Sequence, residues 1–282
     1  MGTPFDEFAN AYPKALASFD ACLKGSYLPK LEAIALRFVH AIEEETLDLR
    51  ECNEREFLSA ILVKATNEMF AMVGALRNGA LLPSYHHARS ILELFASIEH
   101  VYCNPSKKQR KLEKYVEYPK VAKYLHHLTW KQQLAAGQTT EEQFNKLSDD
   151  GNRAPRNREE AARMAAYLEL EGWGSHGCPA LASLCRHLGT IHVVRNDKGV
   201  LEFYEHISHA THFSPFGKTI TRGHYLIGFP SDSNGYDYKR INRPISYGIL
   251  GAHLIAMSLH HTVKSGAIEG VLDLSLDEFL LG

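Results

Sequence analysis

The sequence lacks the features that would direct it to a membrane or to an oxidising compartment. No window approaches the roughly 18 uninterrupted apolar residues of a membrane-spanning helix. The start, MGTPFDEFANAYPKAL, has no basic segment followed by an apolar run, as a secretory signal would. The cysteines are odd in number and scattered without a CxxC pair, at 22, 52, 103, 178 and 185. This pattern is typical of free thiols in a reducing compartment. We therefore expect a cytoplasmic protein that does not contact a membrane.

The chain also lacks the short motifs that would indicate a cofactor or a common catalytic site. It contains no HExxH, no GxSxG, no phosphate-binding P-loop and no GxGxxG before a helix. We therefore expect no cofactor and no bound metal. The net charge of -2 differs from the basic footprint of a dedicated nucleic-acid-binding protein. Residues 107–124 nevertheless contain seven Lys or Arg with tyrosines between them, and this segment is either a solvated helix face or an RNA contact.

What the sequence does have is helical periodicity along nearly its whole length. Apolar residues recur every three or four positions, and polar caps or Gly and Pro separate the periodic segments. The segment 214–243 is different, because Gly, Pro, Ser and Asn interrupt it, and we expect an irregular or short hairpin insert there. The prediction is one all-α domain spanning 1–282, a bundle of about eight or more helices. The expected helices include 5–24, 27–48, 53–78 (opened by a capping box of Asn53 and Glu56), 84–102, 106–135, a short helix after Thr140, 178–189, 198–212 and 245–265.

The segment FYEHISHATHFSP, residues 203–215, carries three histidines at intervals of three. On an α-helix, His206 and His212 lie about 9 Å and about 120° apart. A three-histidine metal site within a regular helix is therefore not expected, although one adjacent pair that includes His209 would be close enough to share an ion.

The apolar side of the same helix indicates a different group of residues. Val200, Phe203, Ile207 and Thr211 form its expected core stripe. One flank of that stripe carries a row spaced by four: Tyr204, Ser208 and His212. Three interpretations of the row stay open. It makes hydrogen bonds in a seam between helices, it provides acid–base or ligand-binding groups near neutral pH, or its histidine binds a metal.

A second polar row lies on the helix expected over 84–102. Arg89, Glu93 and His100 align at spacings of four and seven, opposite the apolar face. Arg89 and Glu93 either form a surface ion pair of small energetic effect, or they face a polar pocket or a partner subunit. In the second case the guanidinium would hold an anion.

These rows, together with the segment EGWGSHGCPALASLCRHLG, resemble a bacterial family of helical proteins known only as a domain of unknown function. The resemblance covers residues 55–215. The matching positions are Ala88, Arg89, Ser90, Glu93, Trp173, Gly174, Leu181, Gly189, Tyr204, Ser208 and His212.

Proteins of this type are distantly similar to the HEPN superfamily, many of whose members are metal-independent ribonucleases in toxin or anti-phage systems. The HEPN signature, an Arg followed after four to six residues by a His, is matched by Arg186 and His192. The resemblance implies an imidazole that acts as acid and base and a guanidinium that stabilises the transition state. Arg89 with His212 is a competing pair from two helices, and both pairings stay open.

Three functional hypotheses follow. The first is an enzyme that acts on RNA or a nucleotide, in a bacterial defence or toxin system. Its site would be lined by Arg89, Glu93, Tyr204, Ser208 and His212, with Arg186 and His192 as the alternative pair. The second is a non-catalytic helical adaptor or ligand sensor with the polar rows at a subunit seam. The third is a metallohydrolase that takes ligands from residues such as His176, His192 or His224. We also expect a homodimer, with no indication of which other protein would bind.

Overall fold

A computed structural model describes residues 23–43, 52–78, 80–149, 192–193, 198–199, 207, 238–260 and 266–273. In this part the protein is all-α, as predicted. Its helices are α3 (Leu28–Glu43), α4 (Cys52–Arg77), α5 (Leu81–Tyr102), α6 (Pro105–Ala135), α7 (Glu141–Asp149), α12 (Tyr238–His260) and α13 (Gly266–Leu272).

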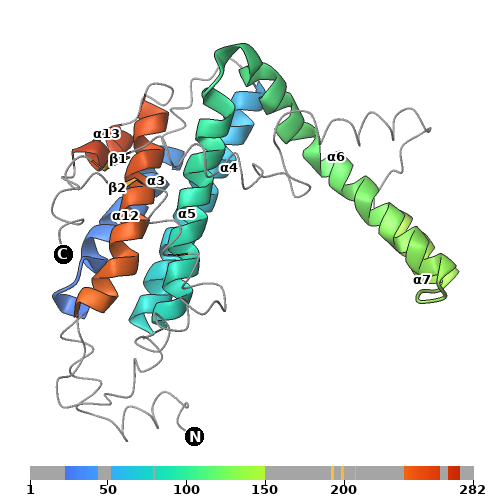
Figure 1. The fold of residues 1–282 in the computed structure, drawn as a ribbon, viewed down its shortest axis with the longest axis horizontal. Coiled ribbons are helices and arrows are strands. Elements are labelled where there is room, and N and C mark those ends of the chain that lie inside the picture. The colour runs from blue at the N-terminus through green and yellow to red at the C-terminus, as the bar shows by residue number, and fades with distance from the viewer. Residues whose placement is uncertain are drawn as a thin grey trace, which may run out of the picture.

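Four helices, α3, α4, α5 and α12, lie side by side as a bundle, and α13 packs on α3 and α12 (Figure 1). The central helix is α5, with α4 on one side and α12 on the other. Two contacts show that α5 and α12 run in the same direction. The rings of Tyr85, near the start of α5, and Tyr247, in the middle of α12, lie 6.3 Å apart, and Ser258 donates to Glu99 at 3.2 Å near the ends of both helices. The fold therefore joins two segments that are far apart in the chain.

The buried core follows the predicted apolar stripes. On α3, Leu28, Leu31, Ile34 and Phe38 are buried, as the 27–48 pattern predicted. Ile207 is fully buried in the same core cluster. Its burial confirms the one member of its predicted stripe that lies within the described residues.

Four local features differ from the prediction. The helix expected over 245–265 begins at Tyr238, because Pro244 lies inside α12 and does not end it. Buried residues on both sides of the proline, Ile241 and Ile245, offset the lost hydrogen bond. The sequence pattern did not predict helix α13, which follows the expected end of that helix at residue 265. Asn53 is inside α4 and is not its N-cap, since the helix begins at Cys52.

The fourth difference is a hairpin in place of a turn between helices. Strand β1 (His192–Val193) pairs antiparallel with β2 (Lys198–Gly199), so residues 198–199 do not begin a helix. The connecting residues include Asn196 and Asp197, which favour turns. Most of the predicted insert at 214–243, and the helices expected over 5–24 (up to residue 22) and 178–189, lie outside the described residues.

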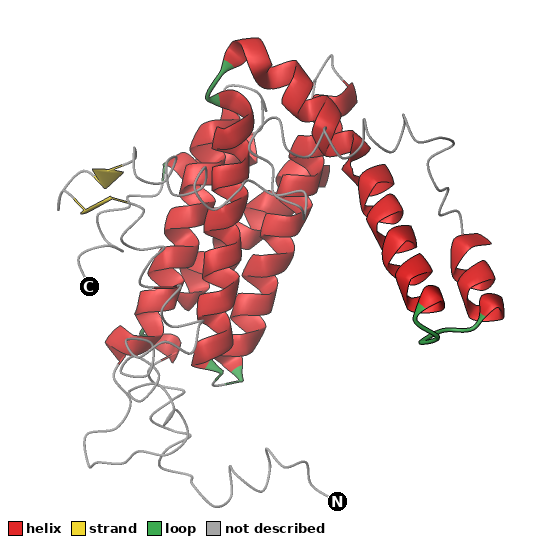
Figure 2. Ribbon diagram, turned by 45° about the vertical axis from the view of Figure 1, so that its right-hand side comes forward, coloured by secondary structure: helices red, strands yellow, loops and turns green. Residues whose placement is uncertain are grey.

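Helix α6 packs its first turns on α4 and α5 and then leaves the bundle, and α7 turns back beside its far end (Figures 1 and 2). Gly137, at φ 68°, ends α6, and its N–H donates to Leu134 at 3.0 Å. Thr140 and Gln143 then cap α7 reciprocally, each backbone N–H donating to the other side chain. We call this α6–α7 projection the arm.

One helical segment among the described residues, Asn53–Arg77, is long and apolar enough to cross a membrane by length and composition alone. Half of its apolar window is buried inside the protein, where α4 packs on α3 and α5. The apolar side chains on one side of α4 therefore pack in the core of the bundle.

The close approach of α12 to α5 gives a test of the fold. A Cβ at Gly251 would lie 2.7 Å from Cγ2 of Ile91 and 3.4 Å from Cδ2 of Leu92. Gly251→Ala should therefore lower the free energy of unfolding by about 1–3 kcal/mol, because the helices must move apart. Urea denaturation measures the change. Gly266→Ala is the matched control, since a Cβ there meets nothing within 4 Å. An equal effect of both substitutions would contradict the proposed close packing.

Candidate functional site

The structure describes some of the predicted site residues and not others. Arg89 and Glu93 lie on α5, and His192 begins strand β1. The remaining four, Tyr204, Ser208, His212 and Arg186, lie outside the described residues. The described chain therefore brings together Arg89 with Glu93.

The Arg89–Glu93 pair is partly shielded from solvent. Nε of Arg89 donates to a carboxylate oxygen of Glu93 at 2.8 Å, and the two side chains are 23% and 41% exposed. A bond to a carboxylate one turn away fixes the direction of the guanidinium along the helix. Arg89 is therefore an oriented cation at the edge of the bundle, more enclosed than the surface pair that spacing alone would suggest.

Two buried tyrosines lie next to this pair. Tyr85 is one turn before Arg89 on α5, and its ring is near that of Tyr247 on α12. Burial raises the pKa of Tyr247 to about 12, against a smaller lowering by Arg243. Burial also raises the pKa of Tyr85, and Tyr247 adds to this rise while Arg243 opposes it. Both hydroxyls are therefore neutral donors near neutral pH, at the seam between α5 and α12.

Sequence reasoning missed Tyr85, Tyr247 and Arg243. Each tyrosine is four residues from an arginine on its own helix, Tyr85 with Arg89 and Tyr247 with Arg243. This repeated spacing is the feature of the sequence from which the two tyrosines and Arg243 could have been predicted. Only the pairing of α5 with α12 shows that the two helices bring their tyrosines together.

The prediction that His100 lies opposite the apolar face is wrong. His100 is only 3% exposed, because the first turns of α6 cover this end of α5. The amine of Lys111 donates to the His100 carbonyl. A cation on the last carbonyls of a helix also complements the helix dipole. The end of the predicted row therefore belongs to the junction between α5 and α6.

The same junction uses several cations of the basic segment 107–124 internally. Glu54 at the start of α4 is 5% exposed, and it accepts from the Tyr102 hydroxyl and from Lys108 at 2.8 Å. Lys111 and Lys114 are 5% and 4% exposed. Much of the predicted basic patch therefore attaches α6 to the bundle. Lys107 and Arg110 are cations of this patch that remain exposed.

A second polar cluster joins α4 to α5. Nδ1 of His87 lies 2.7 Å from one carboxylate oxygen of Glu68, and the amine of Lys64 lies 2.8 Å from the other. Burial alone would raise the pKa of Glu68, but the hydrogen bonds from Lys64 and His87 outweigh burial and hold the pKa below its usual value. The sequence had shown His87 only as a neighbour of His86, because its partner on α4 is not local.

Within the helices and short strands that the structure describes, no three His, Cys, Asp or Glu side chains gather as a metal site would require. The histidines 206, 209 and 212 lie outside these residues, and so do His176 and His224.

Comparison with known proteins gives no relative. The sequence matches no protein-family model, no curated protein and no solved structure. The geometry on α5 and its neighbours therefore carries the functional argument.

The Glu68 cluster predicts how stability depends on pH. The folded pKa of Glu68 lies below its usual value of 4.5, so its ionised form contributes stability above that pH. This contribution is lost as the pH falls through the folded pKa, where the carboxylate takes up a proton. In Glu68→Gln the part of the acid destabilisation that comes from this residue should be absent. Chemical denaturation between pH 6 and the acid limit of the fold measures the difference.

Glu142→Gln on α7 is the matched control, because Glu142 is exposed. It should leave the pH profile close to that of the original protein. A profile of Glu68→Gln that superimposes on the original would contradict a stabilising role of the ionised carboxylate.

Proposed function

We propose that the protein acts on RNA or a nucleotide by metal-independent acid–base chemistry, with Arg89 and His212 as the principal pair. Tyr204, Ser208 and Glu93 would line the same site. The substrate class and the role in a toxin or defence system follow from the HEPN resemblance. The pairing of Arg89 with His212 is taken from the two polar rows of the sequence, Arg89 with Glu93 and Tyr204 with Ser208 and His212.

The observation that carries the proposal is the oriented guanidinium of Arg89. It is 23% exposed and bonded to Glu93, beside the buried hydroxyl-bearing residues Tyr85 and Tyr247. A guanidinium held in this way is suited to a phosphate, because its planar donors match two phosphate oxygens. Electrostatic stabilisation of charge at phosphorus is worth most when the cation is already in place.

The burial of Ile207 supports a contribution of His212 to the proposed site. Ile207 was predicted as the core contact of its helix, and it is fully buried. On a regular helix Ser208 and His212 would then lie on the flank of the segment that meets the bundle. On such a helix His212 would be partly shielded and still within reach of a ligand.

The alternative pair of Arg186 and His192 receives less support. His192 forms a ladder pair with Gly199 in a short antiparallel hairpin. Arg186 lies outside the described residues. We therefore rank Arg89 with His212 first.

In the proposed reaction, His212 accepts the proton of a ribose 2′-hydroxyl as that oxygen attacks the adjacent phosphorus. The P–O5′ bond breaks, the 5′-oxygen takes a proton from solvent water, and a cyclic phosphate forms at the other fragment. The imidazolium of His212 then returns its proton to the solvent. Arg89 stabilises the negative charge that develops on the phosphate oxygens. No metal is required for these steps.

A second candidate function is a non-catalytic adaptor. The arm favours it, because the far part of α6 and α7 extend away from the bundle (Figure 2). The side chains near its tip are largely exposed, as at Lys131, Gln133 and Glu142. An extended helical projection of this kind is suited to contact another macromolecule.

His212→Ala tests the first function against the second. If the enzyme hypothesis holds, cleavage of a mixed RNA pool should fall about 100-fold or more, as for loss of a general acid–base group. Arg89→Gln should cause a loss of about 100-fold. Circular dichroism and thermal melting establish that both variants fold.

His40→Ala is the matched control, since the His40 side chain is 64% exposed on α3. It should leave cleavage unchanged. Full activity of His212→Ala would exclude the enzyme hypothesis in this form. An altered oligomeric state or melting temperature, without turnover in the original protein, would favour the adaptor.

A further inference from the structure

Helix α4 carries large apolar side chains on two of its sides. One side is buried in the bundle and includes Phe57, Leu62 and Met69. The other side carries a row that we call the outer stripe, and each of its members is exposed or half-buried: Glu56, Ala60, Val63, Asn67, Phe70, Gly74 and Arg77.

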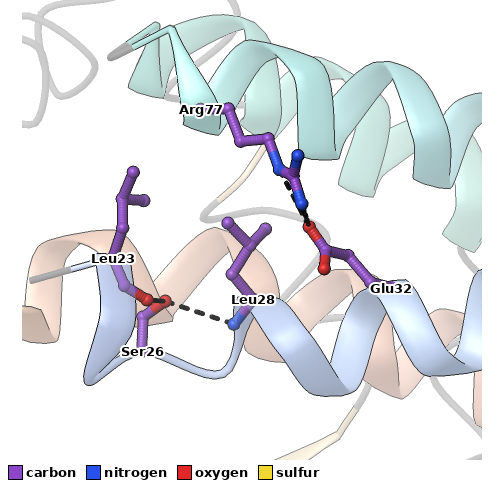
Figure 3. A network of polar contacts seen from close by, with 5 residues as sticks. All are labelled: Leu23, Ser26, Leu28, Glu32 and Arg77. Atoms are coloured by element: carbon purple, nitrogen blue, oxygen red, sulfur yellow. Dashed lines mark hydrogen bonds and ion pairs between the residues drawn. The ribbon is translucent and has the colours of Figure 1, made fainter. Parts of the chain in front are cut away.

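The outer stripe leaves large apolar side chains in water. Val63 is 44% exposed and Phe70 is 42% exposed. Leu36 on α3, 52% exposed, lies one turn from Glu32, which binds Arg77 at the end of the stripe (Figure 3). An exposed apolar group with a polar border is typical of a surface that binds a partner.

The spacing of the stripe indicates what kind of partner fits. Its positions follow one another at alternating intervals of four and three, from Glu56 to Arg77. This is the a/d pattern of a coiled coil, and it extends over three heptads, about 32 Å of helix. A second helix with the same pattern would pack along it.

We propose that the outer stripe binds the outer stripe of a second copy of this chain, in an antiparallel arrangement about a two-fold axis. The proposal is independent of the proposed function. It concerns a surface formed by α4 and bordered by α3, whereas Arg89 lies on α5.

Charge complementarity selects the second copy and the direction. With the axis between Thr66 and Asn67, Val63 of one protomer faces Phe70 of its partner, and Glu56 faces Arg77. Each large apolar residue then meets another, and Glu56 meets Arg77, whose guanidinium also binds Glu32 of its own chain. A parallel pairing would instead place Glu56 against Glu56 and Arg77 against Arg77, and like charges in such positions repel.

Space at the ends of the stripe also suits this register. In this register Ala60 of one protomer lies within one residue, about 1.5 Å along the helices, of Gly74 of its partner. A Cβ built on Gly74 meets nothing within 4 Å in the single chain. Small side chains at these positions allow the two helices to approach closely while Val63 and Phe70 fill the centre.

A membrane is the rival occupant, because Asn53–Arg77 is apolar and long enough to cross one. The outer stripe argues against it. Its ends carry the charged Glu56 and Arg77, its centre carries Asn67, and Lys64 lies beside it with 60% of its side chain exposed. Charged groups within a hydrocarbon layer are costly.

The first test is the oligomeric state of the full chain, by sedimentation equilibrium across a concentration series. The original protein should be a dimer. Phe70→Lys should raise its dissociation constant about 100-fold or more, as expected for a central apolar contact. Met257→Lys is the matched control, because Met257 is 51% exposed but lies on α12. It should leave the dimer intact.

The second test uses cysteine cross-linking to establish the direction. Asn67→Cys places a thiol next to the two-fold axis, so mild oxidation should give a disulfide-linked dimer. Ala60→Cys should not cross-link to itself, because in an antiparallel pair its two copies are about 20 Å apart along the helices. The original protein controls for its own cysteines.

Several results would overturn the proposal. They are a monomeric original protein, a dimer that Phe70→Lys leaves unchanged, or cross-linking of Ala60→Cys as fast as that of Asn67→Cys. A monomer that binds phosphatidylcholine vesicles, with binding lost in Phe70→Lys, would assign the stripe to a membrane and also overturn the proposal.

Discussion

The burial of α5 between α4 and α12 is the constraint on which the rest of the described structure depends. A helix enclosed on two sides leaves its polar side chains little water, so they must find partners within the protein. His87 bonds to Glu68 on α4 at 2.7 Å, and Arg89 bonds to Glu93 at 2.8 Å. The helix that supports the core therefore also holds the best-oriented ionisable groups, and packing and candidate chemistry have a common origin.

Sequence periodicity predicted those parts of the fold that local pattern determines. The stripe of α3, the end of α5 at Tyr102, the extent of α6 and the burial of Ile207 all follow from the spacing of apolar residues. The misplaced features depend on distant residues. Pro244 ends a helix in isolation but not where its neighbours are buried, and the burial of His100 depends on α6 folding back across the end of α5.

The candidate site also has a part that local sequence predicts and a part that depends on distant residues. Arg89 with Glu93 is visible in the sequence, because a spacing of four on a helix places the two side chains together. The additions to it, Tyr85, Tyr247 and Arg243, require the pairing of α5 with a helix some 160 positions later. No local pattern specifies that pairing. It comes from shape, since Gly251 lets α12 approach Ile91 closely enough for the tyrosine rings to meet.

The two proposals concern different surfaces, and this separation has a physical consequence. The outer stripe belongs to the exposed side of α4, whereas Arg89 is near the seam of α5 with α12. A dimer formed through α4 would therefore bury Val63 and Phe70 without covering Arg89. It would also account for the large apolar side chains on two sides of α4, one set for the bundle and one for a partner. Substitutions on the stripe should then change association while leaving the polar pairs of α5 in place.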